Sequence, residues 1–304
     1  MSAPVVVLAG GTGGAKLARG LLDVVGSDDL VVIANTGDDI EIYGAYVSPD
    51  PDLVTFWLAD RIDARGWGLA GDTFNVMEGL RELGVDVWFS LGDRDLAVGL
   101  ARRARLDAGA RLTEALGELG SALGLRARVV PMSDAPVRTR VRGRGGWAPF
   151  QEFMVRSRGE GPVDGVEFAG VEAAQPPPEA LAAIASARAV VIGPSNPVIS
   201  IRPILSVRGI REALRDAPAP VVAVSPIVGG QVVKGPTEPF MAWAGLSLDA
   251  AGVAAAYADV IDGIVTDEPA ADGLPVLQTQ TLMADAADRR RVAEETLRFA
   301  EALA

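Results

Sequence analysis

Short runs of apolar residues recur along the chain, and segments with a helical pattern separate them. The runs are rich in valine, leucine and isoleucine and cover residues 5–9, 30–34, 85–91, 189–193 and 221–225. Between the first two runs, Leu17, Leu21 and Val25 recur on one helix face. Continuous apolar runs are typical of parallel strands that helices cover on both faces. The pattern therefore predicts an α/β fold with a Rossmann-like, doubly wound and mostly parallel sheet.

The pattern changes between about residues 136 and 170. Alternating segments such as 137–141, and a second segment at 150–155, are separated there by glycine-rich turns, which favours antiparallel strands. Three prolines at 176–178 then precede a predicted helix at 179–187. We therefore predict a Rossmann-like nucleotide-binding core from residues 1–125 and 188–304, with a smaller inserted subdomain at 126–187. The last segment, 285–304, is predicted to be an amphipathic helix.

Composition and charge narrow the chemistry. A chain of 304 residues, 49% of them hydrophobic, is long enough for a buried core, and a net charge of −12 argues against nucleic acid as a partner. The arginines between Arg138 and Arg144 are the local exception, either solvated strands or a site for an anionic substrate. The chain has no cysteine and no histidine, so proton transfer must use carboxylates, lysine, tyrosine or water. Any bound metal would take oxygen ligands, which favours Mg²⁺.

The N-terminal segment has none of the features of a secretory signal. No basic segment or long apolar stretch precedes the first predicted strand, and no run approaches the roughly 18 apolar residues of a membrane span. We therefore expect a cytoplasmic protein that does not bind a membrane.

A glycine-rich turn, Gly10-Gly11-Thr12-Gly13-Gly14, follows the first predicted strand, and Lys16 comes shortly after it. Glycines let backbone N–H groups approach phosphate oxygens, and the next helix adds its positive N-terminal end. The spacing matches neither the dinucleotide fingerprint nor the P-loop. The turn therefore predicts a phosphate site, with a tight turn that binds nothing as the alternative.

Acidic groups follow the second predicted strand. Asp38 and Asp39 belong to the segment 35–39, and Asp50 and Asp52 follow in the segment 48–52. Carboxylates beside a phosphate site can hold Mg²⁺ against diphosphate oxygens. A solvated turn or helix cap is the competing interpretation of the aspartate pair.

Further polar segments follow the other predicted strands. Arg94, between Asp93 and Asp95, suits a phosphate or a planar polar ligand, and helix capping by these aspartates is the alternative. Ser195 and Asn196 lie in the segment 193–197 and offer hydrogen bonds to a base or phosphate. The segments 131–134 and 225–227 are placed similarly. Because the carboxyl ends of parallel strands share one edge of a sheet, these segments predict one ligand site there.

The sequence resembles the 2-phospho-L-lactate transferase family of coenzyme F-420 biosynthesis. The similarity is carried by motifs in the family's order, at residues 10–14, 35–39, 49–52, 65–68, 91–95, 131–134, 150–153, 193–197 and 225–227. Pro51 departs from the pattern, because leucine usually separates the two aspartates there.

The resemblance implies a transferase of the phosphotransferase class for substituted phosphate groups. It would move a phospho-organic-acid group, derived from 2-phospholactate, phosphoenolpyruvate or phosphoglycerate, from a guanosine diphosphate conjugate to the deazaflavin Fo and release GMP. Mg²⁺ is the implied cofactor, and a homodimer is common. The implied residues are Asp50 as the catalytic residue, Asp50 and Arg94 for Fo, and Asp38 and Asp50 for the metal. The nucleotide site implied by the turn and by the segment 193–197 comprises Gly11, Thr12, Gly13, Gly14, Lys16, Ser195 and Asn196.

Two other classes of protein compete with this interpretation. YvcK-like regulators share the Gly-Gly-Thr-Gly turn and bind a nucleotide sugar without transferase chemistry, but they carry a Gly-Gly-Ser-Ser run where this chain has 40–44. An NAD-dependent oxidoreductase would need the fingerprint spacing that is missing here. The organic acid of the donor leaves no motif in the sequence.

Overall fold

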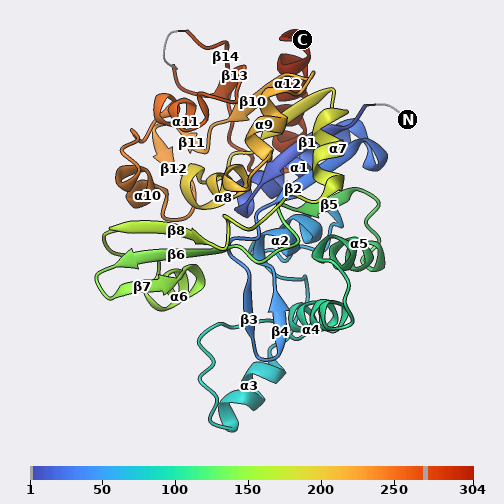
Figure 1. Ribbon diagram of the computed structural model, residues 1–304, viewed down its shortest axis with the longest axis vertical. Helices are drawn as coiled ribbons and strands as arrows, with labels where there is room; N and C mark the ends of the chain where they lie inside the picture. The colour runs from blue at the N-terminus through green and yellow to red at the C-terminus, as the bar shows by residue number, and fades with distance from the viewer. Residues whose placement is uncertain (1–2, 270–272) are drawn as a thin grey trace.

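The computed structural model describes residues 3–269 and 273–304, and its centre is a seven-stranded parallel sheet (Figure 1). The strands follow the spatial order β14-β13-β10-β9-β1-β2-β5. Their bounds are β1 Val5–Ala9, β2 Leu30–Ala34, β5 Arg128–Pro131, β9 Ala189–Ile192, β10 Val221–Val224, β13 Gly263–Thr266 and β14 Val276–Gln278. The predicted α/β fold with a doubly wound parallel sheet is confirmed.

The chain fills the sheet outward from its middle. From β1 it continues through β2 to β5 on one side, and it returns to β9 beside β1 before continuing to β10, β13 and β14. The strand order therefore reverses between β1 and β9. In open α/β sheets a ligand crevice forms at this reversal, outside the carboxyl ends of the strands.

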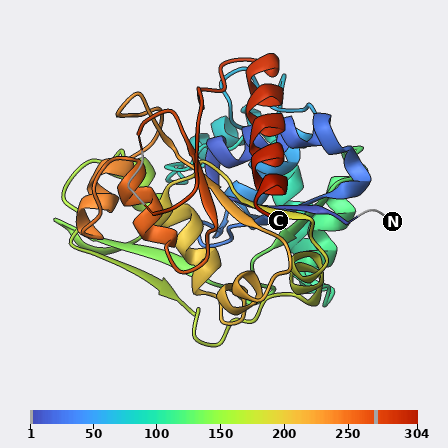
Figure 2. The same cartoon turned by 90° about the horizontal axis from the view of Figure 1, so that it is seen from above.

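Helices cover both faces of the sheet because strand residues alternate between two cores. Val5, Val7 and Ala9 pack with α1 (Gly11–Val25), α2 (Pro49–Leu58) and α12 (Ala286–Ala302). Val6 and Leu8 pack on the other face with α7 (Pro178–Ala185), α8 (Arg202–Ser206), α9 (Ile210–Arg215) and α11 (Ala250–Tyr257). Figure 2 shows α12 lying beside α1. The C-terminal helix predicted from the sequence is thus a covering helix of the main sheet.

A second, antiparallel sheet has the order β7-β6-β8, with β6 at Arg138–Gly143, β7 at Gly146–Pro149 and β8 at Gly165–Ala169. The strand predicted at 150–155 is wrong, because these residues form helix α6 (Phe150–Arg156), which packs against the sheet through Phe153. This sheet lies inside the predicted range 126–187, but both ends of that range serve the main sheet. Strand β5 pairs with β2, and α7 packs on the core beneath β9.

The arginines of β6 lie mostly along the solvated strand. Arg140 pairs with Glu167 of β8 at 2.6 Å, and Arg138 and Arg140 also line a cavity, so both interpretations of this stretch stay open. Arg138 instead donates to the hydroxyl of Tyr46.

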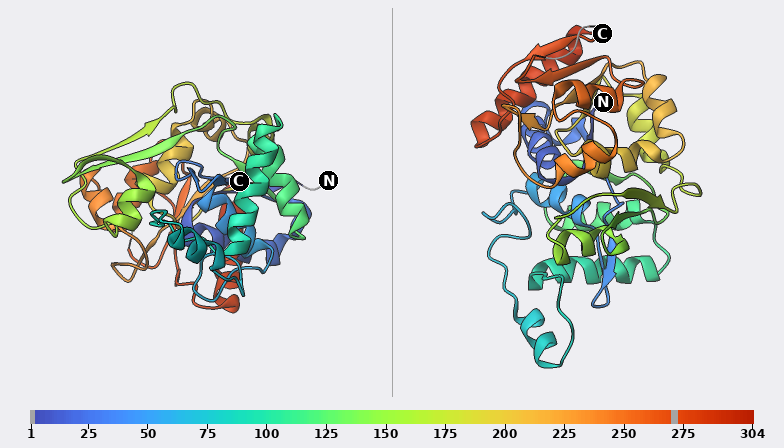
Figure 3. Two further views of the ribbon diagram at one scale, coloured as in Figure 1. Left: turned by 90° about the horizontal axis from the view of Figure 1, so that it is seen from below. Right: turned by 90° about the vertical axis from the view of Figure 1, so that its left-hand side faces the viewer.

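The prediction of a strand at 85–91 is wrong. Residues 85–91 contain no strand, and the third strand on this side of the sheet is β5. The segment lies between α3 (Asn75–Glu82) and α4 (Asp93–Asp107), in an extension that projects from the body (Figure 3). Val87, Phe89 and Leu91 contact a small separate core with the hairpin of β3 (Ile40–Ile42) and β4 (Ala45–Val47). Their apolar character therefore reflects this local packing rather than burial in a sheet.

The aspartates around Arg94 stabilise helix starts. The Asp93 carboxylate accepts from the backbone N–H groups of Asn75 and Val76 at the start of α3. Asp72 accepts from the N–H groups of Arg94 and Asp95 at the start of α4. The alternative that Asp93 caps a helix is thus correct. The helix that it caps is α3, which precedes it, and not α4, which it begins.

The remaining elements complete the chain. They are the short 3-10 helix Ser27–Asp29, α5 Leu112–Ala122, a π-helical turn Pro197–Ile201, the hairpin of β11 (Ile227–Val228) and β12 (Gln231–Val232), and α10 Thr237–Trp243. In residues 3–269 and 273–304, no helix combines the length and apolar character needed to cross a membrane.

Candidate active site

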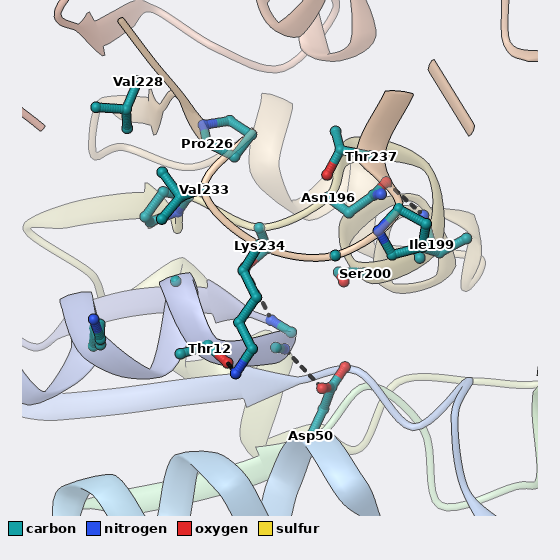
Figure 4. A pocket seen from close by; sticks show the side chains of 18 of the residues that line it. Thr12, Asp50, Asn196, Ile199, Ser200, Pro226, Val228, Val233, Lys234 and Thr237 are labelled. Atoms are coloured by element: carbon teal, nitrogen blue, oxygen red, sulfur yellow. Dashed lines mark hydrogen bonds between the residues drawn. The ribbon is translucent and has the colours of Figure 1, made fainter. Parts of the chain in front are cut away.

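A cavity of about 380 Å³ opens at the carboxyl ends of β1, β9 and β10. Its walls come from the glycine turn, Asp38 and Asp50, helix α6, the segment 194–200, the hairpin segment 225–237 and the segment 281–283. Figure 4 shows side chains from these segments facing one another across it. The cavity lies where the strand order reverses, as expected for a ligand site in this fold.

The glycine turn is the start of α1, which begins at Gly11, rather than a loop before it. Gly11 has a φ of 68°, a conformation that glycine adopts without strain. A Cβ on Gly13 would lie 1.9 Å from the carbonyl oxygen of Pro194, and one on Gly14 would lie 2.7 Å from Ser195 Oγ. These glycines let α1 pack directly against the segment after β9, so packing explains part of the glycine content.

The predicted nucleotide-binding residues gather at this place with one exception. Gly11, Thr12, Gly13, Lys16, Ser195 and Asn196 all line the cavity, whereas Gly14 lies behind it against Ser195. Asn196 Oδ1 accepts from the N–H groups of Val198 and Ile199, and its buried Nδ2 has no partner among the described residues. This nitrogen has almost no exposed surface, so its hydrogen-bonding capacity is unused in this conformation.

Asp38 and Asp50 form the acidic end of the cavity. The side-chain amide of Asn35 donates to both, to Asp38 Oδ1 at 3.2 Å and to Asp50 Oδ2 at 2.8 Å. The N–H of Gly11 donates to Asp50 Oδ1 at 2.7 Å. Asp50 therefore touches the glycine turn directly, and the two predicted metal-binding residues share one neighbour.

Burial makes both carboxylates poor anions in the absence of a cation. Burial and the neighbouring Asp50 charge raise the pKa of Asp38 well above its usual range. Burial also raises the pKa of Asp50 to about 6, although hydrogen bonds from Asn35 and Gly11 favour its charged form. A cation between the two would relieve this cost.

The donor set fits a hard divalent cation that keeps other ligands. Among the described residues, no group of three or more carboxylates gathers in metal-binding range. Two carboxylates with the remaining positions left to water and substrate phosphates is the usual arrangement for Mg²⁺.

Asp52, which the motif places beside Asp50, has a different role. It lies in the first turn of α2 and forms a buried ion pair with Arg102 of α4. Arg102 also donates to the backbone carbonyl of Tyr46 at 2.9 Å. The pair fastens the start of α2, and with it Asp50, to α4. Pro51 fits at this helix start because the first N–H groups of a helix have no intrahelical acceptor.

Arg94 does not join this cavity. Its exposed side chain lies on α4 in a shallow depression with Arg61, Leu69 and Leu123. No ion pair between Arg94 and the flanking aspartates forms in the described structure, because the Asp93 carboxylate caps α3. The flanking aspartates therefore do not orient Arg94 through ion pairs, and its role toward Fo stays a prediction.

The convergence of the strand-end segments holds only in part. The segments after β1, β2, β9 and β10 reach the cavity. The segment 131–134 after β5 does not, because Asp134 accepts from Thr113 at the start of α5. Sequence reasoning missed several lining residues, namely Lys234, Ser200, Thr237 and Met154. Of these, only Lys234 had a signal in the sequence, the rarity of lysine in this chain.

Asp95 gives a test of the electrostatics of the capping region. Burial, together with the charges of Asp52 and Asp72, raises the pKa of Asp95 to about 7. Because the folded protein holds this proton more tightly than the unfolded chain, the free energy of unfolding falls as the pH rises from about 4 to about 7. We expect Asp95→Asn to raise the Tm at pH 8 by about 2–4 °C, the effect of about 1 kcal/mol for a partly exposed group.

Calorimetry at pH 8 and at pH 4 checks this expectation. The gain should fade at the lower pH, where the wild-type carboxyl is already protonated. An equal gain at both pH values would mean that the substitution acts through packing or capping rather than through charge.

Sequence comparison decides the relationship. The model of the family described as 2-phospho-L-lactate transferase matches residues 5–302. This chain belongs to the 2-phospho-L-lactate transferase family. The predicted family resemblance is thereby confirmed, and membership supports a transferase enzyme.

Named relatives agree with the match. The 2-phospho-L-lactate transferase of Methanopyrus kandleri is 41% identical over 100% of this chain and 99% of its own length. That of Methanosarcina mazei is 40% identical over 86% of each chain. The phosphoenolpyruvate transferase of Kitasatospora aureofaciens is 44% identical over 86% of this chain and 84% of its own. Relatives with two different names, 2-phospho-L-lactate transferase and phosphoenolpyruvate transferase, thus have similar sequence identity to this chain.

A solved structure supports the fold alone. The crystal structure of a UPF0052 family member from Bacillus halodurans superposes with a TM-score of 0.63 at 17% identity, over 98% of this chain and 99% of that one.

Proposed function

We propose that this transferase moves a phospho-organic-acid group from a guanosine diphosphate conjugate to the ribityl hydroxyl of the deazaflavin Fo and releases GMP, a step of coenzyme F-420 biosynthesis. The observation that carries the proposal is one cavity whose charged lining divides into an acidic pair, Asp38 and Asp50, and a basic pair, Lys16 and Lys234, around the start of α1. A diphosphate with its bound cation has this same division of charge.

The acidic end would hold Mg²⁺ through Asp38 and Asp50. When bound, the ion neutralises the diphosphate and the departing nucleotide phosphate. The chain's own groups complete this environment. The start of α1 would present backbone N–H groups to the phosphates, beside the Gly11 N–H that donates to Asp50.

A neighbouring cavity supports the acceptor side of the proposal. It is lined by Trp88, Arg138, Phe150 and Gln151 among others, and it shares Asp38 and Phe150 with the first cavity. Aromatic and arginine side chains suit a planar ring system such as a deazaflavin. An acceptor there would direct its hydroxyl toward the two carboxylates.

The proposed transfer exchanges one bond to phosphorus for another. The acceptor hydroxyl oxygen forms a bond to the phosphorus that bears the organic acid, and the bond from that phosphorus to the bridging oxygen breaks. The electron pair leaves with GMP, and the hydroxyl proton is released to water. Asp50, the catalytic residue in this proposal, positions the hydroxyl as well as the cation. A strong base is not required when the leaving phosphate is neutralised.

The test is turnover with defined donors. Purified protein is incubated with Fo, Mg²⁺ and the guanylated lactate, enolpyruvate or glycerate donor, and GMP and product are measured by mass spectrometry. We expect stoichiometric GMP and product with at least one donor, and none when a chelator removes Mg²⁺. Tight binding of a nucleotide sugar with no product from any donor would instead support the regulator class.

A further inference from the structure

Lysine is used in an unusual way in this chain. Of the 28 basic side chains, 26 are arginine and two, Lys16 and Lys234, are lysine. Both lysines line the candidate active site, and the lining residues include no arginine. In the described part of the chain, the cation of each ion pair is arginine. The described ion pairs thus use arginine, whereas both lysines lie in this cavity.

Lys234 reaches the cavity from the hairpin side. It follows β12 and extends across the opening toward the start of α1, where Nζ donates to Thr12 Oγ1 at 3.4 Å (Figure 4). A Cβ on Gly66 would lie 3.9 Å from the same nitrogen. The ammonium therefore sits between the glycine turn and the segment 65–68, one of the motifs that carry the family resemblance.

Among residues 3–269 and 273–304, the two ammonium groups have no carboxylate to balance them. No described carboxylate lies within 4 Å of either lysine nitrogen, although the chain has 40 acidic residues. Burial and the charges of Arg289 and Lys234 lower the pKa of Lys16. Lys16 Nζ donates to the backbone carbonyl of Met283 at 2.9 Å. An anionic ligand between the lysines would remove their repulsion.

A lysine offers here what an arginine does not. Its compact ammonium has three donors on a flexible stem, whereas a guanidinium is a wide planar fork. With one donor of Lys234 directed at Thr12, two remain for oxygens of a bound phosphate.

We propose that Lys234 is a catalytic residue that binds the diphosphate of the donor from the hairpin side, at the glycine turn that Asp50 also contacts. This inference rests on the proposed function of the cavity. Lys234 forms no covalent bond in the reaction. Its ammonium holds the nucleotide phosphate against the start of α1 and stabilises the charge that this phosphate gains as it leaves.

Binding of GDP and of guanosine separates phosphate recognition from base recognition. By titration calorimetry with Mg²⁺ present, Lys234→Ala should weaken GDP binding about 10- to 100-fold, the range for loss of a charge-assisted hydrogen bond. Guanosine, which lacks phosphate, should bind the variant as it binds the wild type. Lys234→Arg should recover only part of the GDP affinity, because it retains the charge but not the compact ammonium, and Lys234→Met, which keeps the apolar stem without the charge, should bind GDP as weakly as Lys234→Ala.

Arg126→Ala is the matched control. It also removes one exposed positive charge, but Arg126 pairs with Asp28 before β5 and β2, at the sheet edge opposite the cavity. Its GDP affinity should equal that of the wild type, and scanning calorimetry should show all variants folded.

The outcomes test the role of Lys234 separately from the proposed transferase function. If the wild-type protein binds GDP and turns over while Lys234→Ala does both equally well, the assignment of Lys234 is overturned and the proposed function stands. If Lys234→Ala loses affinity and Lys234→Met keeps it, the side chain acts by packing, and the assignment is again overturned. If the wild-type protein neither binds GDP nor turns over, the proposed function fails.

Discussion

Replacing Asp50 by alanine is expected to lower turnover by about 1000-fold or more while the protein stays folded. The substitution removes one of two candidate ligands of the cation and the acceptor of the Gly11 N–H. Loss of one group that stabilises developing charge typically costs about 100- to 1000-fold, and loss of a metal ligand adds to this. The fold should survive, because removing a buried carboxylate at pH 8 relieves the cost that raises its pKa to about 6.

GMP release under saturating donor, Fo and Mg²⁺ measures this effect. Asp28→Ala is the matched control, since it removes an exposed carboxylate at the other end of the sheet strands. The control should keep full activity. If Asp50→Ala remains within about threefold of the wild type, Asp50 does not belong to the site.

Removal of Arg102 is expected to give the largest loss of stability. Arg102→Ala leaves Asp52 buried and unpaired and the Tyr46 carbonyl without its donor. Breaking a buried ion pair from one side costs about 3–5 kcal/mol. For a chain of this size the Tm should fall by about 10 °C. Turnover should fall as well, because the pair fastens the helix start that carries Asp50.

The neighbouring residue supplies the control. Arg103 lies on the same helix, is exposed, and pairs with Glu41 and Asp107. Exposed pairs contribute about 1 kcal/mol or less, so Arg103→Ala should shift the Tm by only a few degrees. Equal decreases in Tm for Arg102→Ala and Arg103→Ala would show that the buried ion pair contributes no more to stability than an exposed one. The double variant Arg102→Met with Asp52→Leu should recover part of the stability but not the activity.

The centre of the fold could be predicted because its strands leave little ambiguity. Residues 5–9 and 30–34 are apolar at every position. Such a run is typical of a strand that helices cover on both faces. The segment 85–91 is apolar mainly at alternate positions, and its side chains find partners in a local cluster instead of a sheet. Strand β5 was not recognised because it has only four residues, of which Arg128 is exposed and Pro131 lacks an N–H.

The site was predictable where it depends on the ends of central strands. Gly11, Asp50 and Ser195 meet because β1 and β9 pair directly, and α2 follows the hairpin after β2. Arg94 was predicted to reach the site because it follows the strand predicted at 85–91. That strand does not form, and Arg94 does not line the cavity. Lys234 comes from a hairpin whose path no local pattern specifies, since only the tertiary structure places it over Thr12.

The pairing of β1 with β9 also sets the order in which this protein can be completed during synthesis. Strand β1 emerges first, but its neighbour at Ala189–Ile192 is made some 180 residues later. Until then, one side of β1 has no hydrogen-bonding partner, and Gly13 and Gly14 have no Pro194 and Ser195 to pack against. A nascent chain that stops before this point carries an open sheet edge and half a ligand site. Early translational arrest should therefore yield aggregating fragments rather than a smaller nucleotide-binding unit.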